Sequence, residues 1–272
     1  RMESPLYIGL DVGSVSVNAV VLDNNNNILY NRYIRIHGRP LQVVADVLDK
    51  IQREFETNLI HTLAVTGTGA DLVKRVFGGR KVNEVIAQAQ GTIHYHPEVR
   101  TIIEMGGEDS KLIIINNGGL SDFSMNSLCA AGTGSFLDQQ AARLRINIEG
   151  EFGELALKSV DPPRIAGRCS VFAKSDMIHL QQIATPDYDI VAGLCFAMAR
   201  NFKGTIARGR IMEKPMSFQG GVAANAGMVR AIKEVFELDD DELIVPERFT
   251  SLGAAGAVLT LKFAGEDGFI FP

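Results

Sequence analysis

The sequence predicts an α/β protein made of two similar halves, and three observations lead to that prediction. Predicted strands and helices alternate along the chain, a pattern typical of α/β proteins. A pattern of three strands joined by short turns occupies Leu6–Ile36 and returns in Thr101–Asn126. Glycine-rich turns are also spread along the chain, between residues 11 and 256. Together these features favour two related lobes with a ligand site in the cleft between them.

Composition narrows the classes of protein to consider. The 272 residues are 46% hydrophobic, enough to bury a large core in one large domain or two of ordinary size. The net charge is −5 and no long run of Lys or Arg occurs, which argues against nucleic acid as a partner. The apolar stretches are too short to span a bilayer and the start lacks a signal-peptide pattern, so we expect a cytoplasmic protein. The ends of the sequence suggest a part excised from a longer polypeptide.

The elements of the first half follow from turns and periodicity. Strands are expected at 6–10, 15–22 and 28–36, joined by Asp11–Ser14 and by the Asn24–Asn27 turn, because asparagine tolerates positive φ. Apolar residues three and four apart predict a helix: Leu41, Val44, Val47, Leu48 and Ile51. A strand at Thr62–Thr66 then leads into a turn of Gly67, Thr68 and Gly69.

The second half repeats the start of the first and then becomes mostly helical. A shift of 93 positions aligns Asp11-Val12-Gly13 with Glu104-Met105-Gly106, and it aligns the Asn24–Asn27 turn with Asn117–Leu120. Helices are expected at 133–144, 171–183, 189–208 and 224–236, with short strands at 216–218 and 242–245. We expect one lobe at 5–97, with a C-terminal helix at about 251–264 packed on it, and a second lobe at 98–250.

The glycine-rich turns carry the clearest functional signal. The sequence has neither a Walker A motif nor a Gly-x-Gly-x-x-Gly turn between a strand and a helix, so P-loop and Rossmann sites are disfavoured. Each turn present frees backbone amides that can approach a phosphate. The turns stand at Asp11–Ser14, Glu104–Glu108, Ala131–Ser135, Gln219–Ala223 and Ser251–Gly256.

In order, these turns resemble the phosphate 1, phosphate 2, connect 1, adenosine and connect 2 motifs of the acetate and sugar kinase, Hsp70 and actin superfamily. The resemblance implies a two-lobed fold of duplicated ribonuclease H-like domains that binds ATP or ADP with Mg²⁺. It places Asp11, Glu104 and Glu108 as catalytic residues, with Asp11 reaching the metal through water. The expected nucleotide-binding residues are Gly13, Ser14, Val15, Ser16, Gly106, Gly107, Lys111, Gly132, Thr133, Gly134, Gly220, Gly221, Val222, Asn225 and Gly253.

Two of the three cysteines, Cys129 and Cys169, each precede a predicted amphipathic helix. A helix N-terminus favours a thiolate and an anionic cluster. A [4Fe–4S] cluster takes four thiolates, and a twofold dimer would supply them from two chains. From the residues alone, core packing remains the simpler interpretation of this pair. Cys195 lies on an apolar helical run and is expected in the core.

The histidines and one acidic run carry no clear functional signal. His94 and His96 flank Tyr95 and lack a third metal ligand nearby, so both are interpreted as polar linker residues. The run from Asp239 to Glu242 is interpreted as a solvated turn.

At this point the chain resembles a more specific family: the ATP-dependent activators (archerases) of 2-hydroxyacyl-CoA dehydratases, related to the ATPase subunits of benzoyl-CoA reductase. The similarity runs from about Tyr7 to Leu261. Its most distinctive motifs are Gly9-Leu-Asp-Val-Gly-Ser, Gly106-Gly-Glu-Asp-Ser-Lys, Met125-Asn-Ser-Leu-Cys-Ala-Ala-Gly-Thr-Gly-Ser-Phe-Leu-Asp, Cys169-Ser-Val-Phe-Ala-Lys-Ser-Asp and Gly220-Gly-Val-Ala-Ala-Asn.

This resemblance implies a homodimer with one [4Fe–4S] cluster, held by Cys129 and Cys169 of each subunit. It also implies that ATP hydrolysis drives transfer of a low-potential electron to a partner iron–sulfur dehydratase or reductase. Glu104, Glu108 and Asn18 depart from the Asp, Gln and Lys usual at these positions. They look more like the activase domains of longer relatives, so the partner could be another domain of the same polypeptide.

Two other functions remain open on the sequence. One is a small-molecule kinase of the same fold, such as an N-acetylhexosamine kinase, with Asp109 or a nearby acid as the base for a sugar hydroxyl. The other is a nucleotide-sensing module that binds ATP without turnover. The cysteine pair favours the activator over both.

Overall fold

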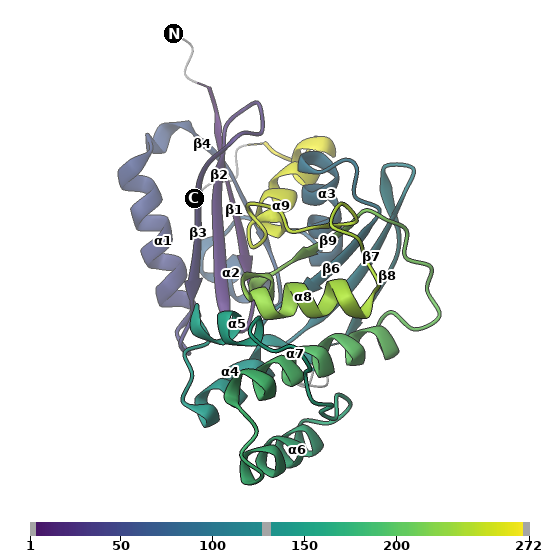
Figure 1. Cartoon of the computed structure of the whole chain (residues 1–272). Helices are drawn as coiled ribbons and strands as arrows, with labels where there is room; N and C mark the ends of the chain where they lie inside the picture. Colours follow the sequence, from purple (N-terminus) through teal and green to yellow (C-terminus); the bar gives the residue numbers. More distant parts are fainter. Residues whose placement is uncertain (1–3, 127–131, 269–272) are drawn as a thin grey trace. The chain divides into compact units, whose positions relative to one another are not determined.

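The computed structural model describes residues 4–126 and 132–268 and divides the chain into two compact units. Unit 1 comprises residues 1–99, 115–121 and 250–272, and unit 2 comprises residues 100–114 and 122–249. Each unit contains one five-stranded sheet with helices packed on it (Figure 1).

The sheet of unit 1 has the strand order β3-β2-β1-β4-β5. β1 pairs antiparallel with β2, and β2 pairs antiparallel with β3, whereas β4 runs parallel to β1 and to β5. In the turn between β2 and β3, Asn26 adopts a φ of 65° and the Asp23 carboxylate accepts the amides of Asn25 and Asn27. The strands are β1 (Leu6–Val12), β2 (Ser16–Leu22), β3 (Ile28–Arg35), β4 (Ile60–Thr66) and β5 (Arg80–Lys81).

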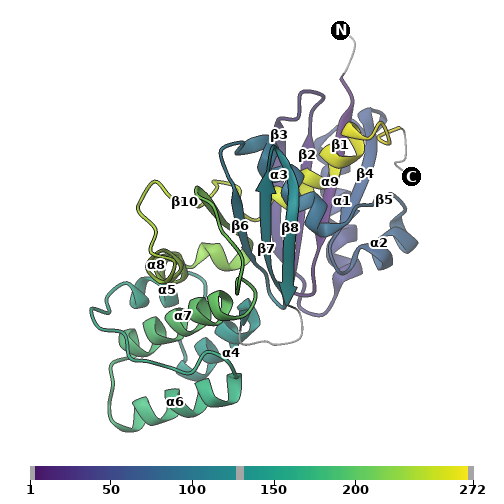
Figure 2. The same cartoon turned by 90° about the vertical axis from the view of Figure 1, so that its right-hand side faces the viewer.

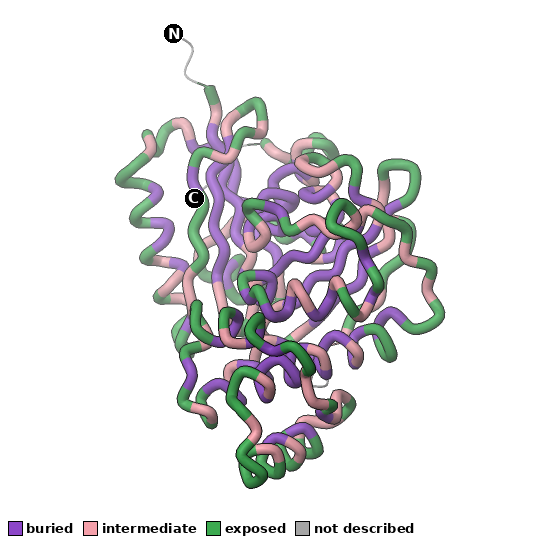
Figure 3. The backbone as a smooth tube through the Cα atoms, in the orientation of Figure 1, coloured by how far each residue is buried: buried purple, intermediate pink, exposed green. Residues whose placement is uncertain are grey.

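Alternating side chains of β1 divide the core of unit 1 into two layers. Ile8 and Leu10 pack on one face of the sheet with α1 and α2, while Tyr7 faces the opposite layer, which contains α9. Figure 1 shows α1 along one face of the sheet, and Figure 3 shows the central strands buried. The helices of this unit are α1 (Pro40–Glu54), the short η1 (Thr57–Leu59), α2 (Ala70–Phe77), α3 (Glu84–Tyr95) and α9 (Leu252–Phe263).

Helices α3 and α9 pack so closely that glycine is required where they meet. A Cβ at Gly91 would lie 2.0 Å from the carbonyl oxygen of Leu252, and a Cβ at Gly256 would lie 1.7 Å from that of Ala87. α9 also approaches the sheet, because a Cβ at Gly9 would lie 2.2 Å from the carbonyl oxygen of Ala254. The start of α9 is thereby held against the end of β1.

The sheet of unit 2 has the order β10-β9-β6-β7-β8, with β6 and β7 antiparallel and β6 and β9 parallel. Figure 2 shows β6, β7 and β8 side by side. The strands are β6 (Thr101–Met105), β7 (Ser110–Asn116), β8 (Gly119–Asn126), β9 (Met216–Gln219) and β10 (Leu243–Ile244); the helices are α4 (Gly134–Leu144), α5 (Glu151–Ala156), α6 (Ser170–Gln182), α7 (Asp187–Gly204), η3 (Gly221–Ala224) and α8 (Ala226–Val235).

Most predicted elements are present, and the differences are specific. The sequence analysis missed α2, α3 and α5. His94 is therefore not a linker residue: it lies in α3, where its ring packs edge-on against Tyr95 and beside Phe263. The helix after Cys169 was expected to be amphipathic, but α6 buries only Ala173 and Met177 and leaves several apolar side chains exposed.

Candidate nucleotide-binding turns and cysteine positions

The first acid-bearing turn follows β1, which ends with Asp11 and Val12. The Gly13 amide donates to the carbonyl oxygen of Ser16 at 2.9 Å and closes the hairpin between β1 and β2. Among the described residues, the amides of Ser14 and Val15 donate to no backbone carbonyl. Two adjacent amides without acceptors form a small concave donor site for an anion.

The second turn repeats this geometry 93 residues later, in unit 2. The Gly106 amide donates to the carbonyl oxygen of Asp109, again at 2.9 Å, and closes the hairpin between β6 and β7. Within the described part of the chain, the amides of Gly107 and Glu108 also donate to no backbone carbonyl. The sequence repeat therefore corresponds to the same hairpin hydrogen bond, with two open amides at each tip.

The carbonyl oxygens of the second turn accept hydrogen bonds, and these bonds fix the direction in which its open amides point. The amides of Gly134 and Ser135, at the start of α4, donate to the carbonyls of Gly106 and Gly107 at 2.9 and 2.8 Å. In a trans peptide the carbonyl and the following amide point in opposite directions. The open amides of Gly107 and Glu108 therefore point away from α4.

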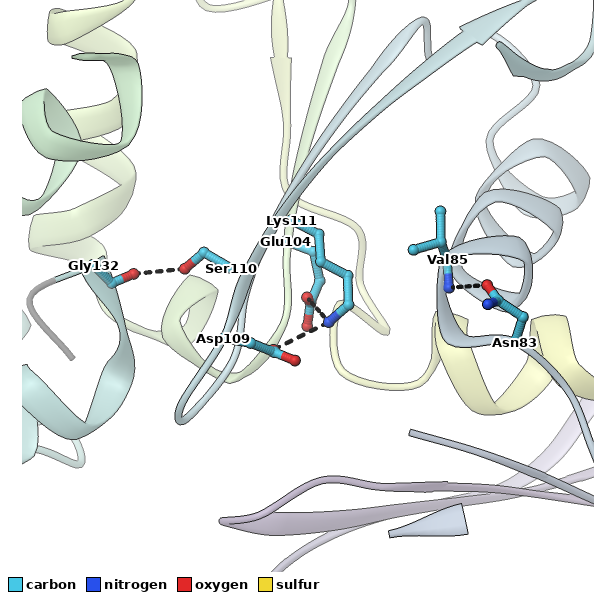
Figure 4. A network of polar contacts seen from close by, with 7 residues as sticks. All are labelled: Asn83, Val85, Glu104, Asp109, Ser110, Lys111 and Gly132. Atoms are coloured by element: carbon cyan, nitrogen blue, oxygen red, sulfur yellow. Dashed lines mark hydrogen bonds and ion pairs between the residues drawn. The ribbon is translucent and has the colours of Figure 1, made fainter. Parts of the chain in front are cut away.

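A further hydrogen bond ties the second turn to the chain just before α4. The buried hydroxyl of Ser110 donates to the carbonyl oxygen of Gly132 at 2.5 Å (Figure 4). Thr133, also buried, is the residue that precedes the first turn of α4. Gly132, Thr133 and Gly134 thus lie against the second turn.

The carboxylate of Asp11 lies in a space that only glycine leaves open. A Cβ at Gly67 would lie 2.6 Å from its Oδ1, and a Cβ at Gly253 would lie 2.5 Å from its Oδ2. The same Cβ at Gly253 would lie 2.6 Å from Nε2 of Gln88, a buried residue of α3. Asp11 and Gln88 therefore converge at the start of α9.

Sequence reasoning missed Gln88 because it missed α3. The signal that could have found this helix is Asn83, whose side chain accepts the amides of Val85 and Ile86 at 2.9 and 3.1 Å and caps the helix (Figure 4).

In unit 2, the predicted catalytic and binding residues Glu104 and Lys111 form an ion pair. Nζ of Lys111 lies 3.2 Å from Oε2 of Glu104 and 3.1 Å from Oδ1 of Asp109 (Figure 4). The Lys111 side chain is 5% exposed, so its ammonium is buried beside the two carboxylates, whose charges it partly offsets. Glu108, by contrast, is exposed at the tip of the turn.

The predicted adenosine loop follows β9 and packs against this network. Gly220 adopts a φ of 92°, and a Cβ there would lie 2.4 Å from the carbonyl oxygen of Met105. Its amide donates to the carbonyl oxygen of Phe249 at 2.8 Å. Gly221 begins the short helix η3, in which Val222 is buried. A methyl carbon of Val222 would lie 3.2 Å from a Cβ at Gly134, so this loop also adjoins the start of α4.

Asn225, expected to bind the nucleotide, has a structural task in this loop. Its Oδ1 accepts the amides of Gly227 and Met228 at 2.9 and 3.2 Å and caps α8. Its buried Nδ2 has no hydrogen-bond partner among the described residues. The amide is therefore half satisfied, which leaves one buried donor for a ligand.

The cysteines can be compared only in part, because Cys129 lies outside the described residues. Cys169 is the N-cap of α6 and is partly exposed. The segment before it is anchored: the Ala166 amide donates to Oδ2 of Asp176 at 2.8 Å, and a Cβ at Gly167 would lie 2.4 Å from the carbonyl oxygen of Ala197. A fixed thiol at a helix N-terminus suits an anionic metal ligand.

Cys195 differs from Cys169 in its burial and in its place in the fold. It is buried on α7, and burial raises the pKa of its thiol to about 12, although Arg230 acts in the opposite direction. The prediction that Cys195 packs in the core is confirmed. Residues 4–126 and 132–268 contain no group of three or more His, Cys, Asp or Glu side chains that could hold a metal ion.

Comparison with solved structures identifies the fold. The structure superposes on component A of the (R)-2-hydroxyglutaryl-CoA dehydratase of Acidaminococcus fermentans with a TM-score of 0.85 and 29% identity, covering 96% of this chain and 99% of that one. It also superposes on a ROK family glucokinase of Streptomyces griseus with a TM-score of 0.54 and 15% identity, covering 94% and 98%. The second likeness shows the fold alone. The predicted fold class, the two-lobed fold of the actin and sugar-kinase superfamily, is confirmed.

Comparison of sequences identifies the family. The chain is 34% identical over 254 residues to a 2-hydroxyisocaproyl-CoA dehydratase activator of Clostridioides difficile, and the match covers 93% of each chain. Residues 8–260 match the model of the BadF/BadG/BcrA/BcrD ATPase family. With its paired glycine hairpins and a fixed cysteine at the start of α6, the chain belongs to this ATPase family.

Proposed function

We propose that the chain binds Mg-ATP through its two acid-bearing hairpins and uses ATP hydrolysis to drive electron transfer to a partner iron–sulfur dehydratase or reductase. The electron would come from an external one-electron donor of low potential. ATP and water would give ADP and phosphate in the same cycle. The similarity to a dehydratase activator supports this choice of partner class. The partner could also be another domain of the same polypeptide.

The observation that carries the nucleotide part is the repeated hairpin. The open amides of Ser14 and Val15 in one unit, and of Gly107 and Glu108 in the other, offer four backbone donors to phosphate oxygens. Asp11 lies beside the first set. Glu104 and Asp109 lie beside the second, with their charges partly offset by Lys111. Phosphoryl transfer depends mainly on such positioning and electrostatic stabilisation.

The proposed catalytic roles of the three acidic residues differ with the exposure of their side chains. Asp11 and Glu104 are held in place, by a glycine cradle and by an ion pair respectively, which suits groups that orient a metal-bound nucleotide. Glu108 is exposed at the tip of the second turn and free to reorient, which suits a group that positions the attacking water. Gly220, Gly221, Val222 and Asn225 would line the adenosine end, with Nδ2 of Asn225 as a donor.

The redox part rests on Cys169 and Cys129 of two protomers, and Cys169 fits this role in position. A [4Fe–4S] cluster, when bound, takes up and releases one electron. The chain's contribution would be two thiolates, one from Cys169 at the start of α6 and one from Cys129, which lies outside the described residues. The apolar side chains that α6 exposes beside Cys169 support a second copy as the source of the other two, because Val171 and Phe172 are both 64% exposed.

The proposal also includes the location, the oligomeric state and the lobes of the chain. The chain would act in the cytoplasm as a homodimer, with lobes near 5–97 and 98–250 and without a nucleic-acid partner. No helix in the described part of the chain is long and apolar enough to cross a bilayer. The kinase alternative has support from the fold only, since the glucokinase likeness is at 15% identity.

Anaerobic purification followed by iron analysis and electron paramagnetic resonance tests the proposal. We expect about four irons per dimer, lost in Cys129→Ala and in Cys169→Ala but kept in Cys195→Ala, the matched control. Iron-free protein with ADP release stimulated by sugars would instead establish a kinase. ATP binding without hydrolysis, even with a reduced partner, would establish a nucleotide-sensing module.

A further inference from the structure

A row of polar side chains lies beside Asp11 in the sheet of unit 1. In the sheet of unit 1, Asp11 pairs in register with Asn18 on β2 and with Thr66 on β4. Residues in register on adjacent strands point to the same face of a sheet. Three oxygen-bearing side chains from three strands therefore stand next to one another, on the face covered by α9.

Two of these oxygens have no hydrogen-bond partner among the described residues. Thr66 is 0% exposed and Asn18 is 8% exposed, and within residues 4–126 and 132–268 neither Oγ1 of Thr66 nor Oδ1 of Asn18 has a partner. Buried polar atoms are satisfied in most folded proteins, so each exception calls for a cause. Stability does not explain the buried hydroxyl of Thr66, because valine would fill the same position with the same shape and without an unsatisfied hydroxyl.

A ligand with a water shell would supply the cause. Mg²⁺ prefers oxygen ligands and keeps several of its waters, which donate hydrogen bonds to surrounding oxygen atoms. Asp11 contributes charge to this row, and Asn18 and Thr66 contribute neutral acceptors on either side. The residues present therefore fit a hydrated cation better than they fit an anion or an apolar group.

We propose that Asn18 and Thr66 are positioning residues that accept hydrogen bonds from the water shell of the nucleotide-bound Mg²⁺, one on each side of Asp11. This inference rests on the proposed nucleotide-binding function. The inference places the hydrated metal ion beside the row of side chains on β2, β1 and β4. The amide oxygen of Asn18 then acts as a neutral hydrogen-bond acceptor.

Two threonines of the same strand make a matched test. Thr62 is also 0% exposed on β4, but its Oγ1 donates to the carbonyl oxygen of Asp267 at 2.7 Å. Thr62→Val removes a hydrogen bond that the protein makes, whereas Thr66→Val removes a hydroxyl without a partner. Thr62→Val should therefore lower stability without affecting binding, and Thr66→Val should weaken binding without lowering stability.

The measurements are thermal unfolding and calorimetric titration of the full chain, with Mg-ADP and with ADP in EDTA. Thr62→Val should lower the melting temperature without nucleotide and leave Mg-ADP affinity unchanged. Thr66→Val should keep or raise that melting temperature and weaken Mg-ADP binding about tenfold, the equivalent of one lost hydrogen bond. ADP binding in EDTA should not change, and Thr66→Ser should restore the affinity.

Asn18→Leu provides a second variant with the same expected loss of magnesium-dependent affinity. If the unmodified chain gains no stability from Mg-ADP, the proposed nucleotide-binding function fails. If the unmodified chain responds to Mg-ADP and both Thr66→Val and Asn18→Leu respond equally well, the function stands and this inference is overturned.

Discussion

Nζ of Lys111 lies 3.2 Å from Oε2 of Glu104, and both side chains are at most 10% exposed. The same ammonium lies 3.1 Å from Oδ1 of Asp109. Two carboxylates therefore share one buried cation in the second turn. Breaking a buried pair is costly, because the charge left behind has lost its water without keeping its partner.

Lys111→Met should therefore destabilise the protein by about 3 kcal/mol. The variant keeps most of the apolar part of the side chain and removes the ammonium, so the loss of stability arises mainly from the two carboxylates left without this partner. Urea unfolding followed by circular dichroism measures it. Lys81→Met is the control, because the Lys81–Asp71 pair has a similar separation, 2.9 Å, but lies at the surface. Equal stability of the two variants would contradict the prediction.

The repeat of 93 residues is the part of the fold that the sequence predicted best. Gly13 and Gly106 donate the same hydrogen bond at the same distance, because each hairpin needs the same acid-x-Gly turn. Turn chemistry is local, so it can be inferred from neighbouring letters. The turns expected at Asn24–Asn27 and Asn117–Leu120 are present but are not equivalent: residues 23–27 separate β2 from β3, whereas only Asn117 and Gly118 separate β7 from β8.

The contacts that complete the site were not predictable, because they join residues distant in sequence. Gln88 meets Asp11 only because α3 and α9 approach at glycines, and although Gly91 lies three residues after Gln88, a glycine in the sequence does not show which helix packs against it. Lys111 was expected to face the nucleotide, and its pairing with Asp109 depends on the side-chain conformations that the hairpin allows. The exposure of apolar side chains on α6 was not predictable for a related reason. A helical pattern in the sequence shows which residues are apolar but not which other elements cover them.

Asp11→Asn should impair Mg-ATP hydrolysis and leave iron content unchanged. The substitution keeps the shape of the side chain in the cradle of Gly67 and Gly253 but removes the charge that faces the metal. Steady-state ADP release and iron analysis of the same anaerobic preparation measure the two effects. Unchanged turnover would contradict the placement of the metal beside Asp11.

Gly220→Ala should prevent the adenosine loop from forming. Its φ of 92° disfavours a side chain, and the new Cβ would meet the carbonyl oxygen of Met105 at 2.4 Å. Gly118→Ala is the control, because Gly118 has a φ of 72° with open space around it. We expect about 1 kcal/mol of destabilisation for Gly118→Ala and a larger loss, together with lost nucleotide binding, for Gly220→Ala. Unfolding curves and ADP titration distinguish the two.

Cys195 should be unreactive in the folded protein, whereas Cys169 should react. Burial raises the pKa of the Cys195 thiol from 9.0 to about 12, so almost no thiolate forms at pH 8. In metal-free protein, Cys169→Ala should remove one reactive thiol from the native titration with a disulfide reagent, and Cys195→Ala should remove none. Because the folded state favours the protonated thiol, Cys195 contributes stability below pH 9 that falls as the pH rises toward 12. Rapid native labelling of Cys195 would contradict its burial.

Phe172→Asp should convert a dimer to a monomer without unfolding the chain. Phe172 and Val171 follow Cys169 by three and two positions at the start of α6, and each is 64% exposed. Apolar side chains so exposed beside a proposed shared cluster are expected to be covered by a second copy. Sedimentation of the anaerobic protein measures the oligomeric state, and circular dichroism checks the fold.

Ile211→Asp is the matched control for this surface, since Ile211 is 85% exposed outside α6. If exposure alone mattered, both variants would behave alike, whereas a dimer formed through α6 is disrupted only by Phe172→Asp. Loss of the dimer should also lower the iron content, because each chain then retains only two of the four thiolates that a cluster takes. A Phe172→Asp variant that remains dimeric with full iron would place the interface elsewhere.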